Sequence, residues 1–165
     1  MNIILIGMPG AGKSTIGVIL AKTLGMNFCD TDLIIQQNTG KRLQQIIDTQ
    51  GLDAFLKAEE EAICSLSCQN TVIATGGSAV LSEKAMAHLQ SHGKCVYLEI
   101  TLEECKRRIQ NIRTRGIAVH KGQTLDDVFG ERLPLYQKYA ERTVCCAGKS
   151  TEDIVAELVS PEKNA

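Results

Sequence analysis

The first fifteen residues constrain the fold of this chain more than any other stretch. An apolar run at residues 2–6, NIILI, is followed at once by the nine residues GMPGAGKST, from Gly7 to Thr15. A glycine, four further residues and then Gly-Lys-Ser is the spacing of a phosphate-binding loop, which joins a buried strand to a helix. A glycine-rich turn with a chance Lys-Ser pair is the alternative, but it would not require a strand before it and a helix after it.

Each part of this loop suits the binding of a polyphosphate. Its glycines let backbone N–H groups curl around the anion without a side chain in the way, and the helix that follows points its positive end at the same place. Lys13 brings a charge to the β- and γ-phosphates, and the Ser14 hydroxyl can ligate Mg²⁺. The sequence therefore predicts binding of ATP and Mg²⁺ at Gly10, Ala11, Gly12, Lys13, Ser14 and Thr15.

Apolar, β-branched segments alternate with amphipathic helical patterns along the whole chain. The predicted strands are 2–6, 27–29, 71–74, 95–100 and 143–146. Because these strands lack a polar face, they predict an α/β fold with a parallel sheet of about five strands covered by helices on both faces. We expect a single domain over 1–165, with acceptor-side helices at about 33–68. A stretch at about 111–123, with four basic residues and two glycines, is predicted to be a mobile lid.

Composition excludes several classes of partner. A net charge of −1, 4% aromatic residues and no Trp argue against a nucleic-acid surface. No segment is long and apolar enough to suggest a membrane span, and the opening apolar run is too short for a secretion signal. The seven scattered cysteines are typical of reduced, buried residues. We therefore expect a cytoplasmic protein, monomeric, with a small molecule as its partner.

Ligands of parallel sheets bind at the carboxyl ends of the strands, which here carry the loops 7–14, 30–32 and 75–78. Asp30 and Asp32 offer one carboxylate for a Mg²⁺ shell and another to take a proton from an attacking hydroxyl; a helix cap is the alternative for this pair. Gly76 and Gly77 offer backbone N–H groups for close approach by a substrate, or form a simple tight turn.

Phosphoryl transfer also needs positive charge around the transferring group. Arg113 and Arg115 lie in the predicted lid, where they either close on that phosphate or form a solvated surface pair. Arg108, just before the lid, either stacks on a nucleotide base or faces solvent. Together, the phosphate loop, the aspartates and the lid indicate phosphoryl transfer from ATP to a hydroxyl of a small molecule.

Four motifs carry a resemblance to a known family. They are the phosphate loop from Gly7, Phe28-Cys29-Asp30-Thr31-Asp32, Ala74-Thr75-Gly76-Gly77-Ser78 and Arg132-Leu133-Pro134-Leu135-Tyr136. In these motifs, and in length and element order, the chain resembles the shikimate kinase family, small P-loop kinases of the nucleoside monophosphate kinase fold. The resemblance implies ATP-dependent phosphorylation of shikimate to shikimate 3-phosphate, in aromatic amino acid biosynthesis.

The resemblance also implies roles for individual residues. Lys13 and Ser14 would serve ATP and Mg²⁺, Asp30 would help bind the metal through water, and Asp32 would contact the substrate hydroxyls and act as the base. The remaining implied roles are the substrate pocket for Gly76 and Gly77, the substrate carboxylate for Arg132, the lid arginine for Arg115 and the adenine side for Arg108.

The chain departs from the family pattern at two places. The family's Phe-Arg-x-x-Glu reads here Phe55-Leu56-Lys57-Ala58-Glu59, so Leu56 holds the position of a carboxylate-binding Arg, and the lid's Arg-Pro-Leu-Leu reads Arg115-Gly116-Ile117-Ala118. Two alternatives follow: a kinase of another small hydroxylated metabolite, and a nucleotide-binding module without turnover. A nucleoside monophosphate acceptor is disfavoured because the aspartates of 30–32 would repel its phosphate.

Overall fold

The computed structural model describes residues 1–109 and 116–161. Its sheet consists of β1 (Asn2–Ile6), β2 (Asn27–Asp30), β3 (Thr71–Ala74), β4 (Gly93–Glu99) and β5 (Arg142–Cys145). The strand order is β2-β3-β1-β4-β5, and every pairing is parallel. The predicted α/β fold with a parallel sheet of five strands is therefore confirmed. The phosphate loop leaves the central strand, so it has a neighbouring strand end on each side.

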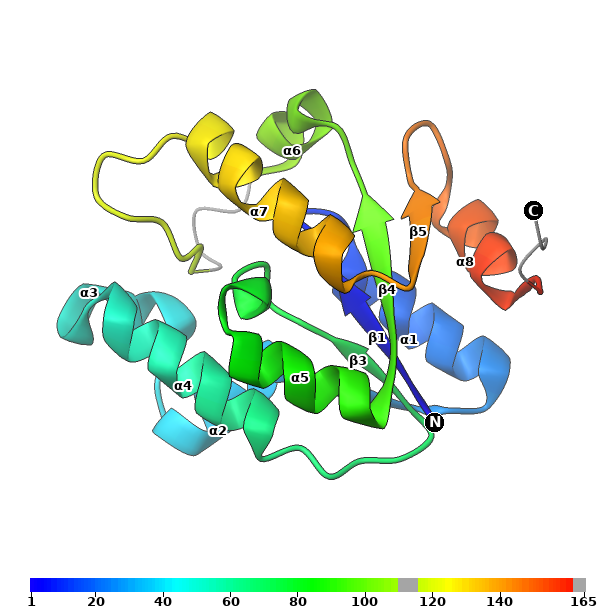
Figure 1. Ribbon diagram of the computed structural model, residues 1–165, viewed down its shortest axis with the longest axis horizontal. Helices are drawn as coiled ribbons and strands as arrows, with labels where there is room; N and C mark the ends of the chain where they lie inside the picture. The colour runs from blue at the N-terminus through cyan, green and yellow to red at the C-terminus, as the bar shows by residue number, and fades with distance from the viewer. Residues whose placement is uncertain (110–115, 162–165) are drawn as a thin grey trace.

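Helices cover both faces of the sheet (Figure 1). On one face, α1 (Lys13–Leu24) packs beside α8 (Thr151–Val159). On the other face lie α5 (Glu83–His92) and α7 (Leu125–Tyr139), with the short 3₁₀ helix η1 (Ala79–Leu81) between them and α6 (Leu102–Ile109) near the start of α7. The two layers bury the strands of the sheet, so β1, with Ile4, Leu5 and Ile6 all fully buried, lies in the main core.

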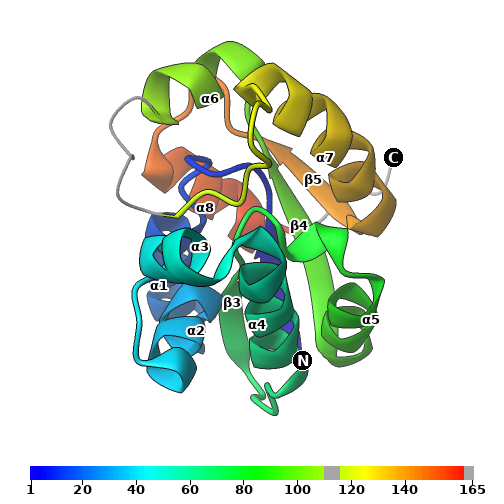
Figure 2. The same cartoon turned by 90° about the vertical axis from the view of Figure 1, so that its left-hand side faces the viewer.

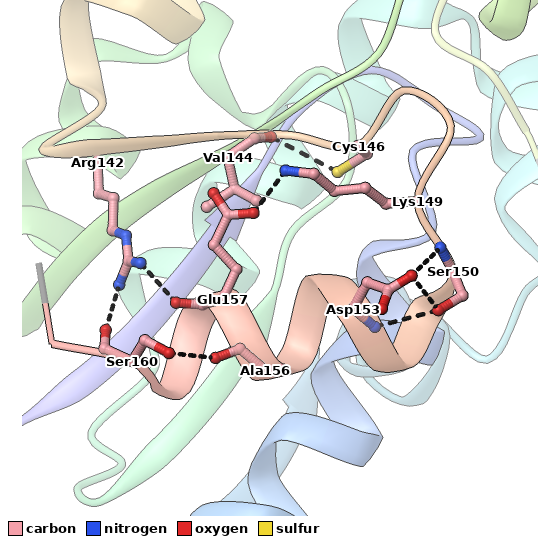
Figure 3. A network of polar contacts seen from close by, with 9 residues as sticks. All are labelled: Arg142, Val144, Cys146, Lys149, Ser150, Asp153, Ala156, Glu157 and Ser160. Atoms are coloured by element: carbon pink, nitrogen blue, oxygen red, sulfur yellow. Dashed lines mark hydrogen bonds and ion pairs between the residues drawn. The ribbon is translucent and has the colours of Figure 1, made fainter. Parts of the chain in front are cut away.

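The C-terminal helix is fixed to the edge strand by polar contacts, which Figure 3 shows. The Arg142 guanidinium donates to the backbone carbonyl of Glu157 at 2.6 Å, and the Lys149 ammonium forms an ion pair with the Glu157 carboxylate at 2.5 Å. The Ser150 hydroxyl caps α8 by accepting a hydrogen bond from the Asp153 N–H at 3.1 Å, and the Asp153 carboxylate accepts one from the Ser150 N–H. These bonds give partners to N–H groups at the start of the helix, which have no acceptor within the helix itself.

Three further helices form a small layer beyond the β2 edge: α2 (Thr31–Thr39), α3 (Leu43–Gln50) and α4 (Leu52–Cys64). Figure 2 shows them together, with the segment that leads toward α7 passing over α3. They have an apolar cluster of their own, which consists of Ile35, Leu43, Ile46, Phe55, Ala62 and Ala118. Ala118 comes from the described end of the predicted lid, so that end is packed into the small layer.

Gly116 is the residue that lets the chain sit against α3. Its φ is +62°, and a Cβ atom there would lie 2.6 Å from the Leu43 Cβ atom. A side chain would therefore meet both backbone strain and a collision. Residues 111–115 of the predicted lid lie outside the described residues.

The acceptor-side helices predicted at about 33–68 begin at Thr31, because Asp30 caps α2, and end at Cys64. The chain then turns through residues 65–70, where Asn70 has a φ of 49°. In the described part of the chain, no helix has the length and apolar character needed to cross a membrane.

Candidate active site

The carboxyl ends of β1, β2 and β3 meet at one edge of the sheet and open into a single cavity. The phosphate loop, Asp32 and residues 75–78 line it. The cavity is completed by Phe55 and Glu59 from α4, Arg132 from α7, and residues 116–118. The loops that the sequence predicted to act together therefore line one cavity.

Lys13 begins α1 and turns back into the phosphate loop. Its ammonium donates to the backbone carbonyls of Gly7 at 2.7 Å and Met8 at 2.8 Å. Burial lowers the pKa of this ammonium to about 8, although nearby Asp32 acts in the opposite direction. Lys13 thus lies inside the curve of the loop, where a phosphate group would meet its charge.

Ser14 and Asp30 bring two oxygen ligands together beside that loop. The Ser14 hydroxyl donates to Asp30 Oδ2 at 2.6 Å, while Asp30 Oδ1 accepts a hydrogen bond from the Asp32 N–H at 2.9 Å. Asp30 is therefore a helix cap, as the alternative reading of the sequence expected, and its second oxygen remains directed at Ser14. A hydroxyl and a carboxylate are hard oxygen ligands, which Mg²⁺ prefers.

In the cavity wall, Gly76 lies beside two carboxylates, that of Asp32 from α2 and that of Glu59 from α4. A Cβ atom on Gly76 would lie 2.5 Å from Glu59 Oε1 and 3.1 Å from Asp32 Oδ1. No side chain fits there, so Asp32 and Glu59 approach the same stretch of bare backbone. The neighbouring Gly77 packs against Pro9, and its carbonyl accepts a hydrogen bond from the Tyr136 hydroxyl at 2.6 Å.

Arg132 places a buried guanidinium in the cavity wall. Only 2% of the residue is exposed. Its Nη2 donates to the Ala118 carbonyl, and its Nε has no hydrogen-bond partner among the described residues. A planar guanidinium with free donor capacity is suited to a carboxylate.

The three other predicted arginines differ in where they lie. Arg108 donates from Nη1 to the Gly10 carbonyl at 2.9 Å and from Nε to Glu104 Oε1 at 2.8 Å, so it is held against the outside of the phosphate loop. Arg113 and Arg115 fall within 110–115, outside the described residues, and their predicted roles in the lid stay predictions.

Glu59 is the site residue to which the sequence reasoning assigned no role. Only 2% of it is exposed, and the Ser78 hydroxyl donates to its Oε2 at 2.5 Å. Burial raises the pKa of its carboxyl to about 7. The signal that could have found it is helical spacing: Glu59 follows Phe55 by four residues and precedes Ala62 by three, so it shares their buried face.

Leu56, one residue after Phe55, lines a neighbouring hollow instead of the cavity. That hollow lies between α4 and the start of α5, and it includes Glu60, Ser82 and Ala85. Glu59 and Ser78 line both spaces, so their hydrogen bond forms part of the wall between them.

A sequence model of the family described as shikimate kinase matches residues 9–161. The chain belongs to the shikimate kinase family. Among its relatives, the shikimate kinase of Haemophilus influenzae (strain PittEE) is 39% identical over 162 residues, 96% of this chain and 90% of the relative. The shikimate kinase of Francisella tularensis subsp. novicida (strain U112) is 39% identical over 161 residues, 95% of this chain and 92% of the relative.

Solved structures agree with this family. The shikimate kinase of Acinetobacter baumannii in complex with shikimate has a TM-score of 0.88 and 31% identity, and the match covers 95% of this chain and 89% of that one. The enzyme of Aquifex aeolicus has a TM-score of 0.82 and 33% identity, covering 96% and 94%. The predicted family and P-loop kinase fold are confirmed, and this shikimate kinase family member is an ATP-dependent phosphotransferase.

Proposed function

We propose that the protein transfers the γ-phosphoryl group of ATP to a hydroxyl of shikimate, which gives shikimate 3-phosphate, a step in aromatic amino acid biosynthesis. The observation that carries this proposal is the shared cavity, which joins the phosphate loop to Asp32 and Arg132. A donor site, a carboxylate and a buried guanidinium in one space are what an anionic, hydroxylated acceptor requires. The shikimate bound in the Acinetobacter baumannii relative supports the same acceptor.

The residues of the phosphate loop suit ATP with Mg²⁺. Residues 10–15 would hold the phosphates, Lys13 would balance their charge, and Ser14 with Asp30 would hold the metal, Asp30 directly or through water. The hydroxyl and carboxylate donor set, 2.6 Å apart, fits this ion. When bound, Mg²⁺ would neutralise negative charge on the β- and γ-phosphates.

On the acceptor side, Asp32 would orient the attacking hydroxyl and take its proton, while Arg132 would bind the carboxylate. The backbone at Gly76 and Gly77 would pass close to the substrate. Arg115 would close on the transferring phosphoryl group as the lid arginine, and Arg108, held on the outside of the phosphate loop, would lie by the adenine. We further infer a cytoplasmic monomer, and charge and composition argue against nucleic-acid and membrane partners.

The experiment that tests this function is coupled ADP release at saturating Mg²⁺ and ATP, with and without shikimate. We expect shikimate to accelerate ADP release at least a hundredfold over the slow hydrolysis of ATP by water, with formation of shikimate 3-phosphate. No acceleration at millimolar shikimate would overturn shikimate as the acceptor.

A second candidate acceptor is another small hydroxylated metabolite, which Leu56 favours because it places an alkyl group where the family pattern has an Arg. This candidate predicts that Leu56→Arg raises shikimate turnover, since a guanidinium would add a charge-assisted bond, worth roughly 1.5–3 kcal/mol. Steady-state kinetics of the variant and of Leu56→Lys would test it. An unchanged kcat/KM for shikimate in Leu56→Arg would count against this alternative.

A further inference from the structure

The last part of α5 carries two histidines, His88 and His92, four residues apart. This spacing places both side chains on one face of a helix. Their imidazole rings are in contact, with centres 4.4 Å apart and planes tilted by 39°. Because α5 ends where β4 begins, the pair lies at the amino end of the parallel sheet, whereas the active cavity lies at the carboxyl end. The pair is therefore separate from the candidate active site.

Hydrogen bonds to backbone carbonyls determine which nitrogen of each ring carries the proton. His88 Nε2 lies 2.8 Å from the carbonyl oxygen of Leu66, and His92 Nδ1 lies 2.8 Å from that of His88. A carbonyl oxygen can only accept, so both of these nitrogens donate an N–H. The Ser91 hydroxyl, 2.9 Å from His92 Nδ1, donates to the same His88 carbonyl at 2.7 Å.

The other nitrogen of each neutral ring therefore keeps its lone pair. These bare nitrogens are His88 Nδ1 and His92 Nε2, and neither has a hydrogen-bond partner among the residues that the structure describes. Packing of the two rings alone, which is the alternative to a binding role, would leave both tautomers open. The carbonyl bonds instead fix the tautomers and hold the bare nitrogens in place.

Metal-binding histidines share this arrangement, in which one ring nitrogen donates to a carbonyl and the other binds the ion. A spacing of four residues on one helical face is also that of the two zinc ligands in the H-E-x-x-H motif. Bonds from imidazole nitrogens to Zn²⁺ are about 2.0–2.1 Å long, so one ion can bridge rings that lie this close. The C-terminal end of α5 also favours a cation, because the helix dipole is negative there.

The surroundings of the pair indicate what kind of ion it takes. No group of three or more His, Cys, Asp and Glu side chains that could hold a metal occurs in the described parts of the chain. The pair therefore offers two protein ligands and leaves the other positions of an ion to water, unlike a structural zinc site with its four protein ligands. Imidazole suits Zn²⁺, Ni²⁺ and Cu²⁺, whereas Mg²⁺ prefers oxygen.

We propose that His88 and His92 form a second metal site, which binds one divalent transition-metal ion through His88 Nδ1 and His92 Nε2. This site differs from the Mg²⁺ site of the phosphate loop in both place and ligand chemistry. Since the His88 ring also bonds to Leu66, in the turn that follows α4, a bound ion fixes the end of α5 against that turn. Metal binding therefore stabilises the folded chain.

The test is calorimetric titration of the full chain with Ni²⁺, without nucleotide or chelator. Ni²⁺ is the probe because it suits imidazole, whereas thiolates, of which this chain can offer several, select other metals. His88→Gln and His92→Gln each remove one ligand, and the Gln amide can still donate to a carbonyl. The matched controls are His120→Gln, which replaces a histidine outside α5, and Cys145→Ser, which replaces an exposed thiol.

We expect wild type to bind one Ni²⁺ per chain at least tenfold more tightly than either His88→Gln or His92→Gln, because a single imidazole cannot chelate. The two variants should have similar weak affinities, and both controls should bind as wild type does. Saturating Ni²⁺ should raise the Tm of wild type and of the controls, and it should leave the Tm of the two variants nearly unchanged.

Equal affinity of wild type and His92→Gln for Ni²⁺ would overturn the inference, because the ion would then be held elsewhere. One ion per two chains, with dimers in size-exclusion chromatography, would also overturn it, since the pair of one chain would not suffice. His92 is exposed, so His92→Gln decides the test if the half-buried His88 does not tolerate replacement.

Discussion

At the scale of single residues, the site consists of polar groups that hydrogen bonds to other parts of the chain hold in place. Asp30 caps a helix with one oxygen and meets Ser14 with the other, and Arg132 uses Nη2 on a carbonyl while Nε stays free among the described residues. Such groups are fixed in position before a ligand arrives, so less entropy is lost when it binds.

Replacing Asp32 tests whether the protein is a catalyst or only a nucleotide-binding module. A general base contributes roughly 10²–10⁴-fold to rate, so we expect Asp32→Ala to lower kcat by about that factor while ATP binding is kept. Stopped-time ADP assays and nucleotide titrations measure the two quantities. Asp48→Ala, an exposed position on α3, is the control. If Asp32→Ala binds ATP and turns over as wild type does, the module without turnover is the better description.

At the scale of elements, the N-terminal caps of helices determine where the functional side chains lie. Asp30 and Thr124 cap α2 and α7, which carry Asp32 and Arg132 into the cavity. The side-chain cap of Thr124 accepts a bond from the Asp127 N–H at 3.2 Å. A cap fixes the first turn of a helix, and hence the direction in which the helix presents its residues.

The cap of α8 offers a test of the element scale away from the site. Ser150→Ala removes the hydroxyl that accepts from the Asp153 N–H, which should cost about 1 kcal/mol of unfolding free energy. Urea unfolding followed by circular dichroism measures this loss, with kcat unchanged because α8 packs on α1 and β5, away from the cavity. Ser91→Ala, at an exposed position near the end of α5, serves as control and should change stability by less than half as much.

At the scale of the whole molecule, the active cavity joins the main sheet to the small layer of α2, α3 and α4. A ligand that contacts both parts binds the folded chain and not the unfolded one, so it raises the free energy of unfolding. At a hundred times its Kd, Mg²⁺·ATP should therefore add about 2.7 kcal/mol to the unfolding free energy. For a domain of this size, that corresponds to a rise in Tm of several degrees. Differential scanning fluorimetry measures this rise, and Lys13→Met should lose most of it.

Much of this arrangement could be predicted from sequence because its signals are local. A few consecutive residues are enough to recognise the phosphate loop, each apolar strand and the Asp30–Asp32 pair. The hydrogen bond between Glu59 and Ser78 could not be predicted, because Ser78 is distant in the chain and comes from another element. Likewise, Arg108 meets Gly10 only through the fold, and the end of α4 at Cys64 depends on the turn that leads to β3.

Gly116 and Ala118 pack on the small layer, and this packing affects how easily their segment can move. Ala118 completes the apolar cluster of Leu43, Ile46 and Phe55, so this segment cannot lift without exposing their surface to water. Each buried methylene-sized group is worth about 0.8 kcal/mol, and every 1.4 kcal/mol changes a ratio of conformers tenfold. Lifting residues 116–118 from the small layer therefore has a free-energy cost, which favours the docked position of this segment beside the cavity.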